Sequence, residues 1–128
     1  MAKILIADDS STEVMMFAKA LEAAGYETIK AYDGEAAERM AIEEMPDLLV
    51  LDIIMPKKNG FHVCRNLKTN PKTRNIPIVI VTAKGEDADV YWGKKQGADE
   101  YLIKPFDVSK LVAAVDRLLK GGPGPAGK

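Results

Sequence analysis

Three acidic residues in this sequence directly follow runs of apolar residues, an unusual place for a carboxylate. Asp8 and Asp9 come after ILIA, and Asp52 comes after LLVL. A carboxylate at the end of a buried strand is costly to desolvate unless a cation or hydrogen-bond donors compensate it. Two other polar residues hold similar places, Thr82 after IVIV and Lys104 after EYLI. The sequence therefore indicates a polar cluster whose members all close apolar segments.

The residue types in this cluster favour metal-assisted phosphoryl chemistry. Several carboxylates within a few ångströms repel one another, and one stays protonated unless a cation intervenes. Oxygen ligands with room for water suit Mg²⁺, whose coordination is often completed by a phosphate. With a metal ion and the Lys104 ammonium nearby, Asp52 is a candidate nucleophile, because carboxylates form aspartyl phosphates. Such transfer depends mainly on positioning and charge neutralisation.

Each of these residues also has an ordinary explanation when it is considered alone. Asp8 and Asp9 could simply begin a helix, where negative charge is favourable. Most lysines are solvated, as Lys104 would be, and Thr82 is a normal strand residue. Their shared position at strand ends is what carries the prediction.

Short apolar runs alternate with segments of helical spacing along the whole chain. The apolar runs have the length of strands and cover residues 4–7, 28–31, 48–51, 78–81 and 101–103. The helical segments are predicted to begin near Ser10, Asp33, Asn59, Glu86 and Asp107. This alternation predicts an α/β fold with a doubly wound parallel sheet covered on both faces. Its strands share one carboxyl edge, where ligands bind in such folds.

The helix ends carry clear signals. Ser10-Ser11-Thr12-Glu13 has the pattern of a capping box, in which the serine and the glutamate side chains each accept a backbone N–H. Gly25 and Gly97 stand where helix-terminating glycines belong, and the last helix is predicted to stop at Gly121-Gly122.

Composition narrows the function classes. The chain has 128 residues, 47% of them hydrophobic, and 18 basic against 19 acidic residues give a net charge of −1. One domain with no basic footprint for nucleic acid is expected. The apolar runs are too short to cross a membrane, and no signal peptide is evident, so we expect a cytoplasmic protein. Cys64 is the single cysteine. Residues 121–128 are Gly/Pro-rich and are expected to be a flexible tail or linker stub.

Four motifs together carry a resemblance to a known family. They are ILIADDS, LLVLDIIMP, IVIVTAK and GADEYLIKPF. Over about residues 1–120 the chain resembles a two-component response regulator receiver domain of the CheY-like type, and single-domain chemotaxis and pilus regulators are the most similar in character. The resemblance implies a flavodoxin/CheY-like fold, with five parallel strands in the order 2-1-3-4-5 and five helices.

The resemblance also implies roles for individual residues. Asp52 matches the phospho-acceptor. Asp8 and Asp9 match the acidic pair that holds Mg²⁺, Asp9 directly and Asp8 largely through water. The backbone carbonyl of Ile54 matches the third protein ligand, and Lys104 matches the lysine that pairs with the phosphoryl group.

Further matches concern the switch and the rim of the pocket. Thr82 matches the hydroxyl that moves to the phosphoryl group, and Tyr101 matches the aromatic ring that turns inward when the hydroxyl moves. The Lys104–Pro105 peptide bond is expected to be cis. Ala83 and Lys84 are expected to border the phosphoryl group.

The resemblance implies a signalling switch and not an enzyme, apart from its own phosphotransfer and autodephosphorylation. A sensor histidine kinase or phosphotransfer protein would donate the phosphoryl group. An output protein would dock on the fourth helix, fifth strand and fifth helix. A monomer or weak dimer is expected, with no contact to nucleic acid or membrane. Trp92 on the fourth helix has two open interpretations, an anchor for a partner or half-buried packing.

Three alternatives predict different chemistry. A flavodoxin-like mononucleotide-binding module needs a loop of N–H donors after the first strand, where Asp8 and Asp9 instead place negative charge. A phosphatase of the haloacid dehalogenase type has a second aspartate where this chain has Ile54. A phosphorylation-independent scaffold does not need Asp52, Thr82 and the other cluster members together.

Overall fold

The computed structural model describes residues 1–120, and strands alternate with helices throughout this part. The strands are β1 (Lys3–Ala7), β2 (Glu27–Ala31), β3 (Leu48–Leu51), β4 (Ile78–Thr82) and β5 (Glu100–Ile103). The helices are α1 (Ser11–Ala23), α2 (Gly34–Glu44), α3 (Gly60–Thr69), α4 (Asp87–Lys95) and α5 (Val108–Lys120). Each observed strand lies within one residue of its predicted bounds. The predicted stop at Gly121-Gly122 and the predicted tail lie outside the described residues.

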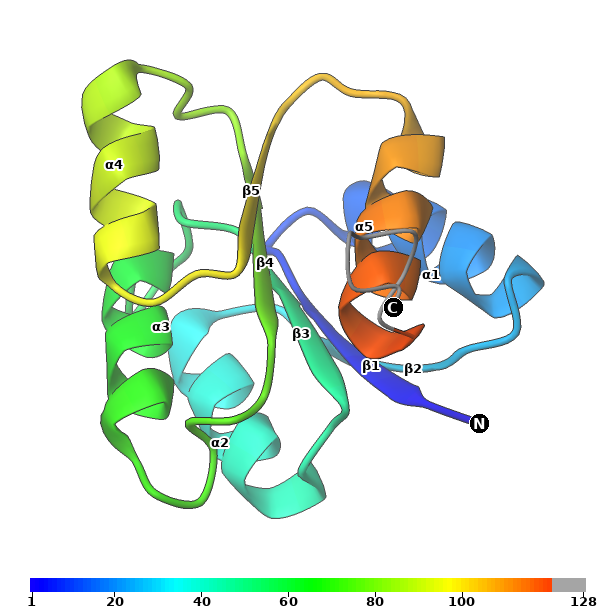
Figure 1. The fold of residues 1–128 in the computed structure, drawn as a ribbon, viewed down its shortest axis with the longest axis horizontal. Helices are drawn as coiled ribbons and strands as arrows, with labels where there is room; N and C mark the ends of the chain where they lie inside the picture. Colours follow the sequence, from blue (N-terminus) through cyan, green and yellow to red (C-terminus); the bar gives the residue numbers. More distant parts are fainter. Residues whose placement is uncertain (121–128) are drawn as a thin grey trace.

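All neighbouring strands pair in parallel in the order β2-β1-β3-β4-β5, which confirms the expected sheet. Helices α1 and α5 cover one face, and α2, α3 and α4 cover the other (Figure 1). The chain passes from β1 to β2 on one side of β1 and then crosses back to β3 on the other side. The strand order therefore reverses between β1 and β3. The ends of β1 and β3 therefore meet at the switch point, where doubly wound sheets bind ligands.

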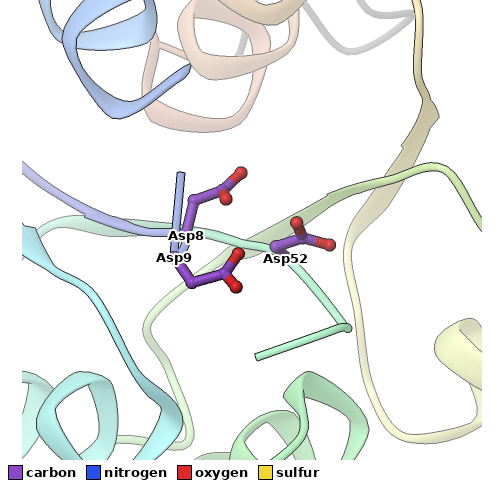
Figure 2. Close-up of side chains that lie close together, drawn as sticks. All are labelled: Asp8, Asp9 and Asp52. Atoms are coloured by element: carbon purple, nitrogen blue, oxygen red, sulfur yellow. The ribbon is translucent and has the colours of Figure 1, made fainter. Parts of the chain in front are cut away.

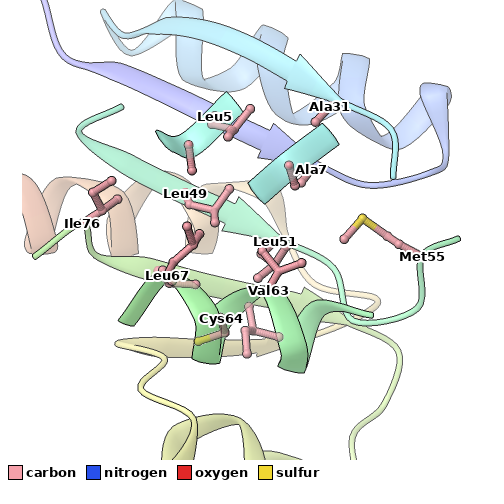
Figure 3. Close-up of a cluster of buried hydrophobic side chains, with 14 of the residues drawn as sticks. Leu5, Ala7, Ala31, Leu49, Leu51, Met55, Val63, Cys64, Leu67 and Ile76 are labelled. Atoms are coloured by element: carbon pink, nitrogen blue, oxygen red, sulfur yellow. The ribbon is translucent and has the colours of Figure 1, made fainter. Parts of the chain in front are cut away.

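Two hydrophobic layers hold the helices to the sheet. Successive residues of β1 point to opposite faces, so Leu5 packs in the layer under α2 and α3, while Ile4 and Ile6 pack under α1 and α5. Figure 3 shows the first layer, in which Leu49 and Leu67 lie among other fully buried side chains. Burial on both faces explains why the central strands β1, β3 and β4 read as apolar runs, whereas the edge strands β2 and β5 are only partly buried.

A close backbone approach fixes the start of α3 against the end of β3. A Cβ built on Gly60 would lie 2.1 Å from the carbonyl oxygen of Asp52. The Gly60 N–H donates to the carbonyl of Ile53 at 2.8 Å, and Asn59 caps the helix through the N–H of His62. Only glycine fits this approach without displacing the segment that carries Asp52.

Candidate functional site

Three acidic side chains gather at the carboxyl ends of β1 and β3. One oxygen atom from each of Asp8, Asp9 and Asp52 lies within 4.8 Å of the other two. Figure 2 shows the three side chains next to one another beyond the strand ends. Asp8 and Asp52 are buried, with 1% and 6% of their surface exposed, while Asp9 is exposed. The sheet thus brings together the acidic residues that the sequence placed at strand ends.

Backbone N–H groups fix the two buried carboxylates. The Oδ1 atom of Asp52 accepts from the N–H of Ile53 at 2.6 Å and from that of Ile54 at 3.4 Å. The Oδ1 atom of Asp8 accepts from the N–H of Ser10 at 2.9 Å. One oxygen of each side chain therefore holds the loop in place, which leaves the other oxygen for the site.

Those remaining oxygens converge on one ammonium. Lys104 Nζ lies 2.9 Å from Asp8 Oδ2 and 3.1 Å from Asp52 Oδ2. Glu13 on α1 forms a third ion pair with the same nitrogen. Burial alone would lower the pKa of Lys104, but its contacts with Glu13, Asp8 and Asp52 raise the pKa above its ordinary value. Lys104 is therefore held protonated at the centre of the cluster.

The role of Glu13 corrects the predicted capping box. Ser10 caps α1 as expected, and its Oγ accepts from the N–H of Glu13 at 3.3 Å. The reciprocal half is wrong, because Asp8 accepts the N–H of Ser10 and the Glu13 carboxylate extends to Lys104. A buried aspartate two residues before the N-cap competes for the N–H group that a capping box requires.

Negative charge exceeds positive charge in this cluster. Within residues 1–120, the carboxylates of Asp8, Asp52 and Glu13 pair with the ammonium of Lys104, and the carboxylate of Asp9 lies beside those of Asp8 and Asp52. Burial and the nearby Glu13 charge raise the pKa of Asp8, although Lys104 and the Ser10 N–H act in the opposite direction. An oxygen-only donor set with surplus negative charge fits a hard divalent cation such as Mg²⁺.

The predicted switch residues lie at the ends of β4 and β5. Thr82 is fully buried, and its Oγ1 lies 3.4 Å from the N–H of Lys84. Tyr101 is only 8% exposed, and its hydroxyl donates to the carbonyl of Lys84 at 2.6 Å. A Cβ on Gly93 of α4 would lie 2.7 Å from the Tyr101 ring. Because glycine has no side chain, the ring can occupy this space. The Tyr101 ring is therefore buried against α4.

The remaining predicted residues border the site in different ways. The Ile54 side chain is 59% exposed, and with Lys84 it lines a hollow of about 270 Å³ next to β3. Lys84 Nζ lies 3.9 Å from Asp89 and makes no ion pair with the acidic cluster within residues 1–120. Ala83 is exposed, and the Lys104–Pro105 peptide is cis.

Trp92 lies away from this cluster. Its side chain is 48% exposed and lines a hollow between α3 and α4 together with Arg65 and Gln96. Partial exposure is compatible with both interpretations of this residue, the partner anchor and half-buried packing.

Residues 4–116 match the family described as response regulator receiver domain. The chain belongs to this family. Receiver domains are the phosphorylation-activated signalling switches of two-component systems and are not enzymes in the usual sense. They typically bind a divalent metal, for which this receiver domain offers its acidic cluster. Membership also implies interaction with histidine kinases or output partners.

Curated relatives and solved structures agree with this assignment. Protein PilH of Pseudomonas aeruginosa is 42% identical over 121 residues, which are 94% of this receiver domain chain and 100% of PilH. The transcriptional regulator RpaA of Synechocystis is 41% identical over 120 residues, which are 94% of this chain but only 50% of RpaA. The chemotaxis protein CheY4 of Vibrio cholerae has a TM-score of 0.86 at 32% identity and covers 93% of this chain and 99% of its own.

A second solved structure has a similar fit. The receiver domain of the Francisella response regulator 1452 has a TM-score of 0.88 at 30% identity, covering 94% of this chain and 98% of its own.

Within residues 1–120, none of the helices of this receiver domain combines the length and the apolar character that a membrane span requires.

Proposed function

We propose that this receiver domain accepts a phosphoryl group on Asp52 from a sensor histidine kinase or phosphotransfer protein, with Mg²⁺ as its cofactor. The observation that carries the proposal is the set of contacts made by the two oxygens of the Asp52 carboxylate. One oxygen accepts hydrogen bonds from backbone N–H groups, and the other accepts from Lys104 at the carboxyl end of the sheet. In the transfer, a bond forms between a carboxylate oxygen and phosphorus while the bond to the donor nitrogen breaks and its electron pair returns to the donor.

The acidic cluster supplies the metal site in this proposal. Asp8, Asp9, Asp52 and the backbone carbonyl of Ile54 would hold Mg²⁺, which when bound offsets the negative charge of the carboxylates and of the incoming phosphoryl group. The surplus of carboxylates over ammonium groups supports this assignment. Lys104 contributes a fixed positive charge beside Asp52.

Thr82 and Tyr101 connect the site to a docking surface. Thr82 closes β4, which pairs with β3, and we propose that its hydroxyl hydrogen-bonds a phosphoryl oxygen on Asp52. Tyr101 ties β5 to the segment after β4 through the carbonyl of Lys84. We propose that an output protein binds the surface formed by α4, β5 and α5, and that phosphorylation biases this surface between two conformations.

Labelling with a small phosphodonor tests the proposed function. The protein is incubated with phosphoramidate or acetyl phosphate, with Mg²⁺ or with EDTA, and its intact mass is measured. We expect one phosphoryl adduct that requires Mg²⁺ and is absent from Asp52→Asn. Asp47→Asn is the matched control, since Asp47 stands at the opposite end of β3 and should leave labelling unchanged.

The same experiment separates the alternatives. A scaffold or a mononucleotide-binding module predicts no adduct under any condition. An adduct that persists in Asp52→Asn, or one that forms equally well in EDTA, contradicts the proposed acceptor or the proposed metal requirement.

A further inference from the structure

Glu13 occupies a position that the capping pattern of the sequence does not explain. It lies in the first turn of α1, and its carboxylate reaches across to the ammonium of Lys104 after β5. The cap of α1 does not need this carboxylate, because Ser10 Oγ caps the helix and Asp8 accepts the N–H of Ser10. Glu13 therefore acts on the site and not on its own helix.

Three carboxylate oxygens crowd the ammonium of Lys104. An ammonium group has three N–H donors. Oxygens of Asp8, Asp52 and Glu13 surround Lys104 Nζ, one from each side chain. Two of the N–H donors bond Asp8 and Asp52, and the Glu13 oxygen lies against the ammonium as an ion pair. A phosphoryl oxygen on Asp52 that approaches Lys104 therefore competes with the Glu13 oxygen for the same space.

Glu13 is the most easily released of the three. Asp8 and Asp52 are buried and are each fixed by backbone N–H groups. The Glu13 side chain is 35% exposed, and its buried Oε1 has no hydrogen-bond partner within residues 1–120, so the ion pair with Lys104 is what holds it. A long side chain at the rim can also turn to water at small cost, which the anchored aspartates cannot.

We propose that Glu13 is a positioning residue for Lys104, a counter-ion that holds the ammonium in the unphosphorylated protein and yields it to the anion at Asp52. This inference rests on the proposed function of Asp52 and concerns the regulation of the same site. Glu13 competes with the phosphoryl group for Lys104, and its charge repels that group. The same charge adds to the field that attracts a divalent cation.

The two effects of Glu13 have opposite signs for the two ligands. In Glu13→Gln, the loss of the ion pair with Lys104 and the weaker repulsion favour an anion at Asp52. Mg²⁺ alone is bound less tightly, because one negative charge is lost and Lys104 is freer to pair with Asp8 and Asp52. A residue that only stabilised α1 would shift both affinities in one direction or neither.

Three variants separate these explanations. Glu13→Gln removes the charge and the ion pair with little change in shape. Glu22→Gln makes the same charge change near the other end of α1, far along the helix from Lys104. Ser10→Ala removes the cap of α1 while leaving the charges of the site intact, and therefore reports the effect of helix stability alone.

The experiment measures Mg²⁺ binding by calorimetry and beryllofluoride binding at saturating Mg²⁺ by NMR, with the Lys104 ammonium signal followed in the ¹⁵N dimension. For Glu13→Gln we expect beryllofluoride affinity to rise about three- to tenfold and Mg²⁺ affinity to fall about threefold, the scale of one partly screened charge. In wild type, beryllofluoride should shift the Lys104 signal as the contact with Glu13 is released. Glu22→Gln and Ser10→Ala should change neither affinity by more than about twofold.

Two results would overturn the inference. If wild type and Glu13→Gln bind beryllofluoride equally well, Glu13 does not compete for Lys104, while the proposed function of Asp52 survives. If neither protein binds beryllofluoride with Mg²⁺ present, the proposed function fails, and the inference fails with it. The two failures are therefore distinguishable.

Discussion

Acidic side chains at the two ends of the parallel sheet differ in how well hydrogen-bond donors and cations compensate their charge. At the amino end, Asp99 Oδ2 accepts from the N–H of Ile78 at 2.8 Å and from Lys68 Nζ at 3.0 Å. Asp47 Oδ2 accepts from the N–H of Lys3 at 2.7 Å. Each of these carboxylates has its own donors and ties a strand start to its neighbour.

At the carboxyl end, several carboxylates share the positive charge of one lysine. Asp8, Asp52 and Glu13 all contact Lys104, and Asp9 lies within 4.8 Å of the first two without a share of this ammonium. Like charges at short distance repel, so this arrangement is favoured by additional positive charge beyond that of Lys104. Acidic residues at the amino end thus stabilise the fold, whereas those at the carboxyl end carry unbalanced negative charge, which fits the proposed metal site.

Removal of Asp99 should produce the largest change in stability. Asp99→Ala leaves the Ile78 N–H and Lys68 without their acceptor, so the free energy of unfolding should fall by about 2–3 kcal/mol in urea denaturation. Mg²⁺ affinity should stay within about twofold of wild type, since this end holds no surplus charge. A large loss of Mg²⁺ affinity would mean that the two ends are not independent.

Removal of Lys104 should have a smaller effect that Mg²⁺ reverses. Lys104→Ala should remain folded, but loss of the ammonium that pairs with Asp8, Asp52 and Glu13 should lower the free energy of unfolding of metal-free protein by about 1–2 kcal/mol. Added Mg²⁺ should restore much of this loss in thermal denaturation, because it replaces the missing positive charge. No such recovery is expected for Asp99→Ala, and equal recovery in both variants would contradict the comparison.

Neutralisation of Asp8 should stabilise the protein. Burial raises the pKa of Asp8, so its ionised form opposes folding at neutral pH, and this opposition disappears as the pH falls and the carboxyl is protonated. Asp8→Asn should therefore raise the free energy of unfolding of metal-free protein by about 1 kcal/mol at pH 7, with a smaller gain in acid. Melting curves at both pH values check the sign. Destabilisation at pH 7 would place Asp8 with the structural carboxylates of the amino end.

Removal of the Tyr101 hydroxyl should produce the smallest change in the free energy of unfolding. Burial raises the pKa of its hydroxyl to about 12. An unfolded chain releases this proton near pH 10, so the contribution of Tyr101 is intact below that pH and is lost as the pH rises towards 12. Tyr101→Phe should lower the free energy of unfolding by about 0.5–1 kcal/mol at neutral pH through loss of the bond to Lys84, and should flatten the alkaline decline. An unchanged alkaline profile would show that the hydroxyl is free in solution.

The sequence predicted the sheet and its polar edge well, because both depend on short-range patterns. Unbroken apolar runs mark strands buried on both faces, and Asp8, Asp52 and Thr82 follow such runs directly. The strand order came from family resemblance, since alternation alone does not determine which strands are neighbours. Once that order is known, the meeting of the β1 and β3 ends follows.

The partners of long side chains could not be predicted. Glu13 satisfies a local capping pattern and a contact across the fold equally well in sequence, and only the position of Lys104 decides between them. The same holds for Asp99 and Lys68, which lie 31 residues apart in the chain. Asp89, whose Oδ2 lies 3.3 Å from the N–H of Glu86, was missed because an aspartate is less typical than glutamate in a capping box.

A Mg²⁺ titration tests most directly whether the carboxyl end alone holds surplus negative charge. Calorimetry on wild type should show one Mg²⁺ per chain, with affinity reduced at least about tenfold in Asp9→Asn, because this carboxylate has no share of Lys104 and is free for a cation. Asp47→Asn at the amino end should bind as wild type does. Absence of Mg²⁺ binding in wild type, or an equal loss in Asp9→Asn and Asp47→Asn, would contradict the account.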